Sequence, residues 1–180
     1  VEIEVNNNKK IQLTGSKSEN VTASVEDDTL NIIHMNYKLR GKNAIRINAV
    51  DGIDSSIKIG DVKFIVTFPD GREQEVTTNE QGIAEIPDIP VPGEGAFTYE
   101  IRQKNTIDGY KDNTTPIYVE ITFGGEGVIT NVRKISGNAD TELLEETVGL
   151  FENKIANITI KQERTEQGPF GDYDIKIIEK

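Results

Sequence analysis

Residues 62–71, Val-Lys-Phe-Ile-Val-Thr-Phe-Pro-Asp-Gly, contain the pattern that decides the fold class of this chain. Apolar side chains recur at every second position from Val62 to Phe68. This is the period of a strand with one face in a core and the other in water. Pro69-Asp70-Gly71 ends the run with residues that favour a tight turn. The stretch therefore predicts a β-strand that leads into a hairpin.

The same alternation recurs along the chain, and turn residues separate the runs. Further turn signals lie at residues 79–82 (Asn-Glu-Gln-Gly) and 92–95 (Pro-Gly-Glu-Gly). Many short alternating segments with regular turns are typical of an all-β sandwich or barrel. We expect strands at residues 44–48, 62–68, 97–102, 117–123 and 157–162.

One segment has features of a helix. Residues 141–149, Thr-Glu-Leu-Leu-Glu-Glu-Thr-Val-Gly, place acids early in the run, where they suit a helix dipole. Asp140 or Thr141 offers an N-cap. The run is too short to be stable as a helix without packing, so the sequence leaves a short helix and a non-helical structure open.

The composition argues against several classes of function. The chain has 180 residues, enough for one domain or two small ones. Its net charge of −11 repels phosphate backbones and anionic membranes, so we expect no nucleic acid and no membrane contact. The absence of Cys excludes thiol catalysis, thiolate metal sites and disulfides. No window has the 18 or more apolar residues that indicate a transmembrane helix.

Candidate catalytic and metal-binding residues are sparse. The single histidine, His34, lies on an alternating segment, where an outward-facing strand residue is the simpler interpretation. The acidic runs at 26–28 and 145–146 are typical of a solvated surface. Residues 51–54, Asp-Gly-Ile-Asp, offer oxygen ligands for calcium but lack the spacing of an EF-hand loop. We therefore predict no catalytic, cofactor-binding or metal-binding residues and no enzymatic activity.

The sequence contains an internal repeat. Residues 1–33 align without gaps with residues 119–151, at a shift of 118, and share seven identities. A second similarity relates residues 32–38 to residues 158–164, and each is followed by a polar linker and a new alternating segment. Self-similarity at a fixed period indicates an array of units strung along the chain.

The repeat predicts three parts. Residues 1–39 are expected to be the C-terminal part of a preceding repeat, residues 40–165 a complete β-sandwich, and residues 166–180 the first strand of a following repeat. The chain would then be a fragment of a longer protein. Because orphan strands leave backbone groups unpaired, we hypothesise that residues 1–38 and 166–180 pair, within one chain or between chains. The alternative is that residues 1–38 pack on the sandwich and the tail is disordered.

Four motifs in the centre of the chain occur together in a known family. They are Gly60-Asp-Val-Lys-Phe-Ile-Val66, Thr77-Thr-Asn-Glu-Gln-Gly-Ile-Ala84, Phe97-Thr-Tyr-Glu-Ile-Arg-Gln103 and Ile107-Asp-Gly-Tyr110. In this order and at this spacing, they resemble the prealbumin-like B-type domains of Gram-positive collagen adhesins and pilins. The resemblance covers about residues 44–124. It implies an immunoglobulin-like, prealbumin-like β-sandwich from a bacterial surface protein.

Many members of that family carry an isopeptide bond between a Lys and an Asn side chain. An acidic residue catalyses it inside an apolar core, where the neutral amine and acid are favoured. The resemblance implies the lysine near Asn48 or Ala49, the acid at Gln103, and the acceptor amide at Asn157 or Gln162. The lysine and the acid are missing from these positions, so we expect no isopeptide bond.

Together these expectations favour a non-catalytic structural module, a stalk or spacer, of a tandem-repeat cell-surface protein. The protein would be extracellular and anchored to the cell wall of a Gram-positive bacterium, with neighbouring repeats as partners. One alternative is an adhesin module that binds a host protein or glycan, which an exposed apolar patch or open sheet edge would support. The other is an accessory domain of a secreted enzyme.

Overall fold

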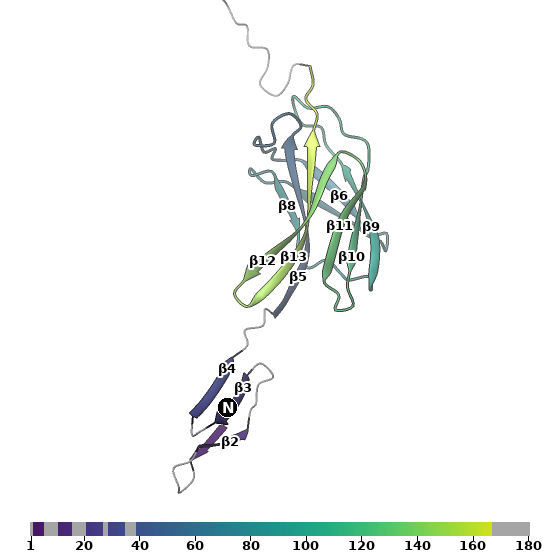
Figure 1. The fold of residues 1–180 in the computed structure, drawn as a ribbon. Helices are drawn as coiled ribbons and strands as arrows, with labels where there is room; N and C mark the ends of the chain where they lie inside the picture. The colour runs from purple at the N-terminus through teal and green to yellow at the C-terminus, as the bar shows by residue number, and fades with distance from the viewer. Residues whose placement is uncertain (1, 6–10, 16–20, 27–28, 35–38, 167–180) are drawn as a thin grey trace, which may run out of the picture. The chain divides into compact units, whose positions relative to one another are not determined.

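The computed structural model describes residues 2–5, 11–15, 21–26, 29–34 and 39–166. The chain divides into two compact units, residues 1–39 and residues 40–180, which we call the N-terminal unit and the sandwich unit (Figure 1). All the regular elements of the described residues are β-strands. Among the same residues, no helix has the length and apolar character needed to span a membrane.

The N-terminal unit contains two separate antiparallel hairpins. Strand β1 (Glu2–Val5) pairs with β2 (Ile11–Gly15), and β3 (Val21–Glu26) pairs with β4 (Thr29–His34). His34 therefore lies on a strand, as predicted, opposite Val21. In the described part of this unit, each hairpin forms a two-stranded sheet of its own.

The sandwich unit has two sheets, which confirms the predicted all-β sandwich. One has the strand order β11-β10-β9-β6-β7 and the other β12-β13-β5-β8. All five predicted strands are present, and β6 and β7 meet across the predicted turn at residues 69–71. The bounds are β5 (Leu39–Asp51), β6 (Lys63–Thr67), β7 (Glu73–Thr77), β8 (Ile83–Ile86), β9 (Gly95–Gln103), β10 (Ile117–Phe123), β11 (Ile129–Ser136), β12 (Ala139–Val148) and β13 (Phe151–Gln162).

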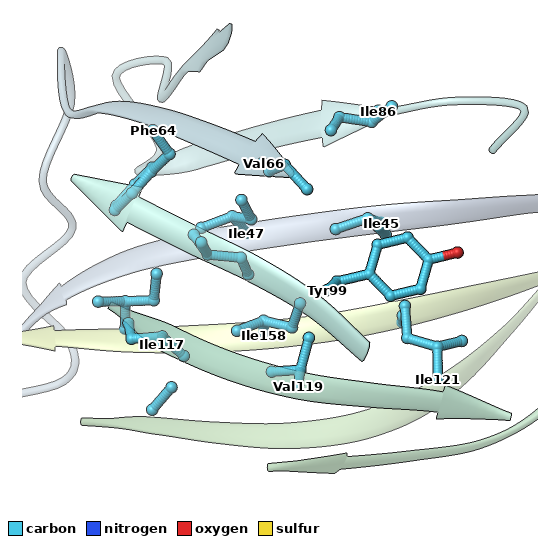
Figure 2. Packing of buried hydrophobic residues seen from close by; sticks show 14 of the residues in the cluster. Ile45, Ile47, Phe64, Val66, Ile86, Tyr99, Ile117, Val119, Ile121 and Ile158 are labelled. Atoms are coloured by element: carbon cyan, nitrogen blue, oxygen red, sulfur yellow. The ribbon is translucent and has the colours of Figure 1, made fainter. Parts of the chain in front are cut away.

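The core lies between the two sheets. Alternate residues of each central strand turn inward, so that Val62, Phe64, Val66 and Phe68 are all buried. In Figure 2, side chains of one sheet, such as Ile158, lie among those of the other. The sequence alternation thus becomes the inner face of a sandwich.

The short helix considered for residues 141–149 is wrong, because this segment forms strand β12. It pairs with β13 along its whole length, from Ala139↔Ile160 to Val148↔Phe151. Gly149 and Leu150 make the two-residue turn, and Gly149 has a φ of 63°, a conformation that favours glycine. A helix this short would leave many backbone groups unpaired, whereas the hairpin pairs them with β13.

The first and last strands of the sandwich, β5 and β13, are neighbours that run in the same direction. Near their starts, the N–H of Lys42 donates to Asn153 Oδ1 at 2.8 Å. At their ends, the N–H of Gly52 donates to the carbonyl O of Gln162, also at 2.8 Å. The chain therefore passes into the sandwich where β5 begins, the proximal end, and leaves from the opposite, distal end (Figure 1).

Candidate functional site at the distal end of the sandwich

Three inward-facing positions mark the distal ends of β5, β9 and β13. They are Ala49, Gln103 and Gln162, and each continues the alternation of buried residues on its own strand. The ends of β5 and β13 are joined there by the Gly52 to Gln162 hydrogen bond. The loop that follows β9 returns to the same place, where Tyr110 forms a β-bridge with Arg164. Strand ends that are far apart in sequence thus meet at one end of the core.

Buried amide groups at this end lack partners. The side chain of Gln162 is 0% exposed, and neither its Oε1 nor its Nε2 has a hydrogen-bond partner among the described residues. Gln103 donates from Nε2 to the carbonyl O of Asn105 at 2.7 Å, whereas its buried Oε1 has no partner in the same residues. An unpaired buried polar group costs free energy, so an ordinary core position would favour an apolar side chain.

The structure shows which of the alternative crosslink positions face the core. Asn48 and Asn157 turn to the outer face of their sheet, where Asn48 Nδ2 donates to Asn157 Oδ1 at 2.7 Å. Ala49 and Gln162 turn to the core instead. Of the positions considered for a crosslink, the inward pair is therefore Ala49 and Gln162.

An ionic cluster around a buried carboxylate lies at the same end of the core. Asp51, the last residue of β5, has a side chain that is 0% exposed. Its Oδ2 accepts from Arg164 Nε at 2.5 Å and from the Tyr110 hydroxyl at 3.0 Å. Its Oδ1 accepts from the backbone N–H groups of Ile53 and Asp54 at 2.8 and 2.9 Å. We call Asp51, Tyr110 and Arg164 the Asp51 clamp, because they join the first strand, the loop after β9 and the segment after the last strand.

Hydrogen bonding sets the charge state of the clamp. Burial by itself would raise the pKa of Asp51, but the bonds from Arg164, the two backbone amides and Tyr110 hold that pKa well below its usual range. Burial and the bond to Asp51 raise the pKa of Tyr110 to about 12. At neutral pH the clamp therefore consists of a carboxylate, a guanidinium and a neutral phenol.

The clamp also bears on the calcium hypothesis for residues 51–54. The Asp51 carboxylate already accepts four hydrogen bonds. In the described residues, no three His, Cys, Asp or Glu side chains cluster in a way that would hold a metal ion. The absence of metal-binding, cofactor-binding and catalytic residues stays a prediction.

Residues 43–136 match the family model of the SpaA prealbumin-like fold domain, which is more than half of the chain. The chain belongs to this family. The match begins in β5 and ends with β11, so β12 and β13 lie outside the matched range.

Several solved structures are similar to this SpaA-family chain. The Bacillus anthracis TIE protein is 15% identical with a TM-score of 0.43, over 87% of this chain and 24% of its own. The pilus adhesin RrgA from Streptococcus pneumoniae is 16% identical with a TM-score of 0.43, over 69% and 15%. BcpA, the major pilin subunit of Bacillus cereus, is 15% identical with a TM-score of 0.37, over 84% and 41%. The chain thus spans a quarter or less of the first two, and no curated protein matches it.

The lysines of the SpaA-family domain lie away from its core. Within residues 41–166, each lysine is exposed or half-buried. An isopeptide bond needs an amine inside the core, next to the acceptor amide. Ala49 has no functional group to offer Gln162, so the arrangement lacks a nucleophile.

We expect the chain to show the full mass of its sequence, because the lysines of residues 41–166 are exposed or half-buried and none of them lies in the core with the buried amides. Formation of a Lys–Asn or Lys–Gln bond expels one ammonia, and formation of a Lys–Asp bond expels one water. Intact-mass spectrometry of the denatured chain measures this directly. A mass that is short by either molecule would show that a crosslink forms.

Sequence reasoning missed an exposed apolar surface at the proximal end of the domain. The β12–β13 hairpin carries Val148, Leu150 and Phe151 at its tip, with 62%, 63% and 50% of their surfaces exposed. We call these residues the hairpin tip. The sequence feature that indicates this exposed surface is Gly149, which starts a two-residue turn between Val148 and Phe151. Because the sequence left a helix and a non-helical structure open for residues 141–149, it did not predict a projecting hairpin.

Proposed function

We propose that this SpaA-family domain is a non-catalytic, load-bearing spacer in a bacterial cell-surface protein. The observation that supports the proposal is the arrangement of β5 and β13, which are parallel neighbours with chain connections at opposite ends of the domain. A pull on the chain from both sides acts along these two strands in opposite directions. It loads the hydrogen bonds between them together, in shear, rather than one after another.

The domain also has the length that a spacer needs. Strand β5 has 13 residues, Leu39–Asp51. At about 3.3 Å per residue it is roughly 40 Å long, which sets the distance that each unit adds to a stalk. No enzymatic step is needed for this role.

Contacts at the distal end spread the load over more than one element. The Asp51 clamp ties Arg164 to β5, and Thr165 donates its N–H to the carbonyl O of Gly109 at 2.9 Å. Lys111 donates its N–H to the carbonyl O of Glu163 at 2.8 Å. Force on the segment after β13 is therefore carried by the first strand and by the loop after β9.

The proposal places the protein outside the cell, on a Gram-positive cell wall, with neighbouring repeats as its partners. Family membership supports a module of a surface protein. Two of the similar structures are described as a pilus adhesin and a major pilin subunit. An acidic chain with 31 acids and 20 Lys and Arg residues suits a solvated extracellular surface.

The mechanical role is tested by pulling the chain in two geometries. Because the chain has no Cys, introduced cysteines give unique attachment points. Handles at Lys42→Cys and Glu163→Cys pull from opposite ends and shear β5 against β13. Handles at Lys42→Cys and Phe151→Cys pull from the proximal end only and unzip the strands.

We expect the shear geometry to require a clearly higher unfolding force than the unzipping geometry at the same pulling rate. Unfolding of residues 42–163 should then extend the chain by most of its contour length, at about 3.6 Å per residue, because no crosslink shortens it. Both measurements come from single-molecule force spectroscopy. Equal forces in the two geometries would rule out a load-bearing arrangement of β5 and β13.

The hairpin tip favours a second candidate function, an adhesin module that binds a host protein. Exposed apolar patches on a soluble domain mark contact sites for other molecules. The triple variant Val148→Ser, Leu150→Ser, Phe151→Ser should abolish binding of the chain to an immobilised panel of extracellular matrix proteins. Ile53→Ser is the matched control, since Ile53 is 78% exposed at the distal end. A parent chain that binds none of the panel would count against this candidate.

The third alternative is an accessory domain of a secreted enzyme. It differs from the other two in requiring a catalytic domain elsewhere in the same gene product. The full-length gene sequence decides this point.

A further inference from the structure

The first hairpin of the N-terminal unit resembles a hairpin of the sandwich in its strand pairing. The shift of 118 found in the sequence carries β1 onto β10 and β2 onto β11. It also carries two residue pairs at the ends of the hairpin onto pairs that exist in the sandwich. These are Glu2↔Gly15 onto Glu120↔Arg133, and Val5↔Ile11 onto Phe123↔Ile129. The two hairpins therefore agree in register at both ends of the β1–β2 pairing, and the two pairs between those ends differ by one residue because the bulges lie at different positions.

The second hairpin shows the same agreement. The shift of 118 carries β3 onto β12. The shift of 126 found for residues 32–38, when extended back to residue 29, carries β4 onto β13, whereas the shift of 118 would place β4 across the turn at residues 149–150. Both end pairs again fall on existing pairs, Val21↔His34 on Ala139↔Ile160 and Glu26↔Thr29 on Leu144↔Ile155. The two shifts differ because the β12–β13 hairpin is longer than the β3–β4 hairpin. The additional residues form its projecting end, which includes the hairpin tip.

The four N-terminal strands therefore correspond to the last four strands of the sandwich. In the sandwich, β10 pairs with β9 on its other side, and β13 is the neighbour of β5. In the described part of the N-terminal unit, β1 pairs with β2 alone and β4 with β3 alone. The unpaired edges of β1 and β4 are thus the edges that β9 and β5 cover in the complete domain. An open edge presents N–H and C=O groups in register for another strand.

We infer that the N-terminal unit is the closing half of a second SpaA-type sandwich, and that its open edges bind an opening half. The partner is a segment equivalent to β5–β9, supplied by the same polypeptide ahead of β1. Its last strand lies antiparallel to β1, as β9 lies beside β10. Its first strand lies parallel to β4, as β5 lies beside β13. This inference rests on strand pairing and does not depend on the load-bearing function.

The test compares the 180-residue chain with the natural polypeptide extended towards its N-terminus by the length of an opening half. Hydrogen–deuterium exchange is measured for β1–β4 in both. We expect the amides of β1 and β4 to exchange about 100-fold more slowly in the extended chain, because they enter a cooperative sandwich. Calorimetry should show a second unfolding transition. The amides of β10 and β13 are the internal control, and their exchange should not change.

Two outcomes would overturn the inference. One is an extended chain in which β1 and β4 exchange as fast as in the 180-residue chain. The other is protection of β4 in the 180-residue chain that rises with protein concentration and is lost when residues 167–180 are deleted. That result would assign the edge to the C-terminal segment of another copy, whose Ile175-Lys-Ile177 resembles Ile45-Arg-Ile47.

Discussion

Asp51→Ala is expected to lower the free energy of unfolding of the sandwich by about 3 kcal/mol, the low end of the loss that is typical of a broken buried ion pair, because Asp51 is buried and the Arg164 side chain is 25% exposed. The variant removes the carboxylate that accepts hydrogen bonds from Arg164, from the Tyr110 hydroxyl and from two backbone N–H groups. It also frees the segment after β13 from the end of β5. The loss is therefore both electrostatic and structural.

Urea unfolding of the parent, Asp51→Ala, Arg164→Met and the double variant measures the coupling within the clamp. The double variant should lose less than the sum of the single variants, because each single change already removes the Asp51–Arg164 hydrogen bond. Asp54→Ala is the matched control, since the side chain of Asp54 is exposed and accepts hydrogen bonds from Ser56. A loss below about 1 kcal/mol for Asp51→Ala would mean that the clamp contributes no more than an exposed pair.

The clamp also predicts a direction for the pH dependence of stability. The pKa of Asp51 is lower in the folded chain than in the unfolded chain. Its contribution is then fully present above the unfolded value of about 4 and is lost as pH falls through the lower folded value. The difference in unfolding free energy between the parent and Asp51→Asn should therefore shrink as pH is lowered from about 5 towards 2.

Gln162→Met is expected to raise the free energy of unfolding by about 1–3 kcal/mol, the cost of leaving a buried polar group unpaired. Gln162 is fully buried, and both polar atoms of its amide lack partners in the described residues. Met has a similar volume and no strong hydrogen-bonding group, so it removes the penalty without leaving a cavity.

Thermal unfolding measures the gain, with Gln103→Met as the matched control. Gln103 loses its hydrogen bond to the carbonyl O of Asn105 in that variant, so no gain is expected. A lower midpoint for Gln162→Met would show that the amide of Gln162 is satisfied in the folded protein, for instance by an enclosed water.

The alternation of apolar and polar residues was sufficient to predict the strands of the core. The alternation from Val62 to Phe68 reports which residues are buried, because side chains of a strand point to opposite faces in turn. The turn at Pro69-Asp70-Gly71 was predictable for a similar reason, since backbone preferences of these residues act within a few positions. The four central motifs were also enough to identify the family.

Strand β12 could not be predicted in this way. Residues 141–149 combine helix-forming and strand-forming residues, and their structure depends on pairing with β13. Cross-strand partners outweigh the weak preference of so short a segment for a helix. The exposed hairpin tip follows from that pairing, and was missed with it.

By itself, the sequence determined the all-β class, the central strands and the family of this protein, because those depend on periods and motifs that are local. Only the tertiary structure decided which of Asn48 and Ala49, and which of Asn157 and Gln162, faces the core. A shift of one residue in register turns every side chain of a strand to the other face, and pairing sets that register. The bond between Asp51 and Arg164 likewise joins residues 113 positions apart. No local pattern encodes such a contact, which exists because the first and last strands of the sandwich end side by side.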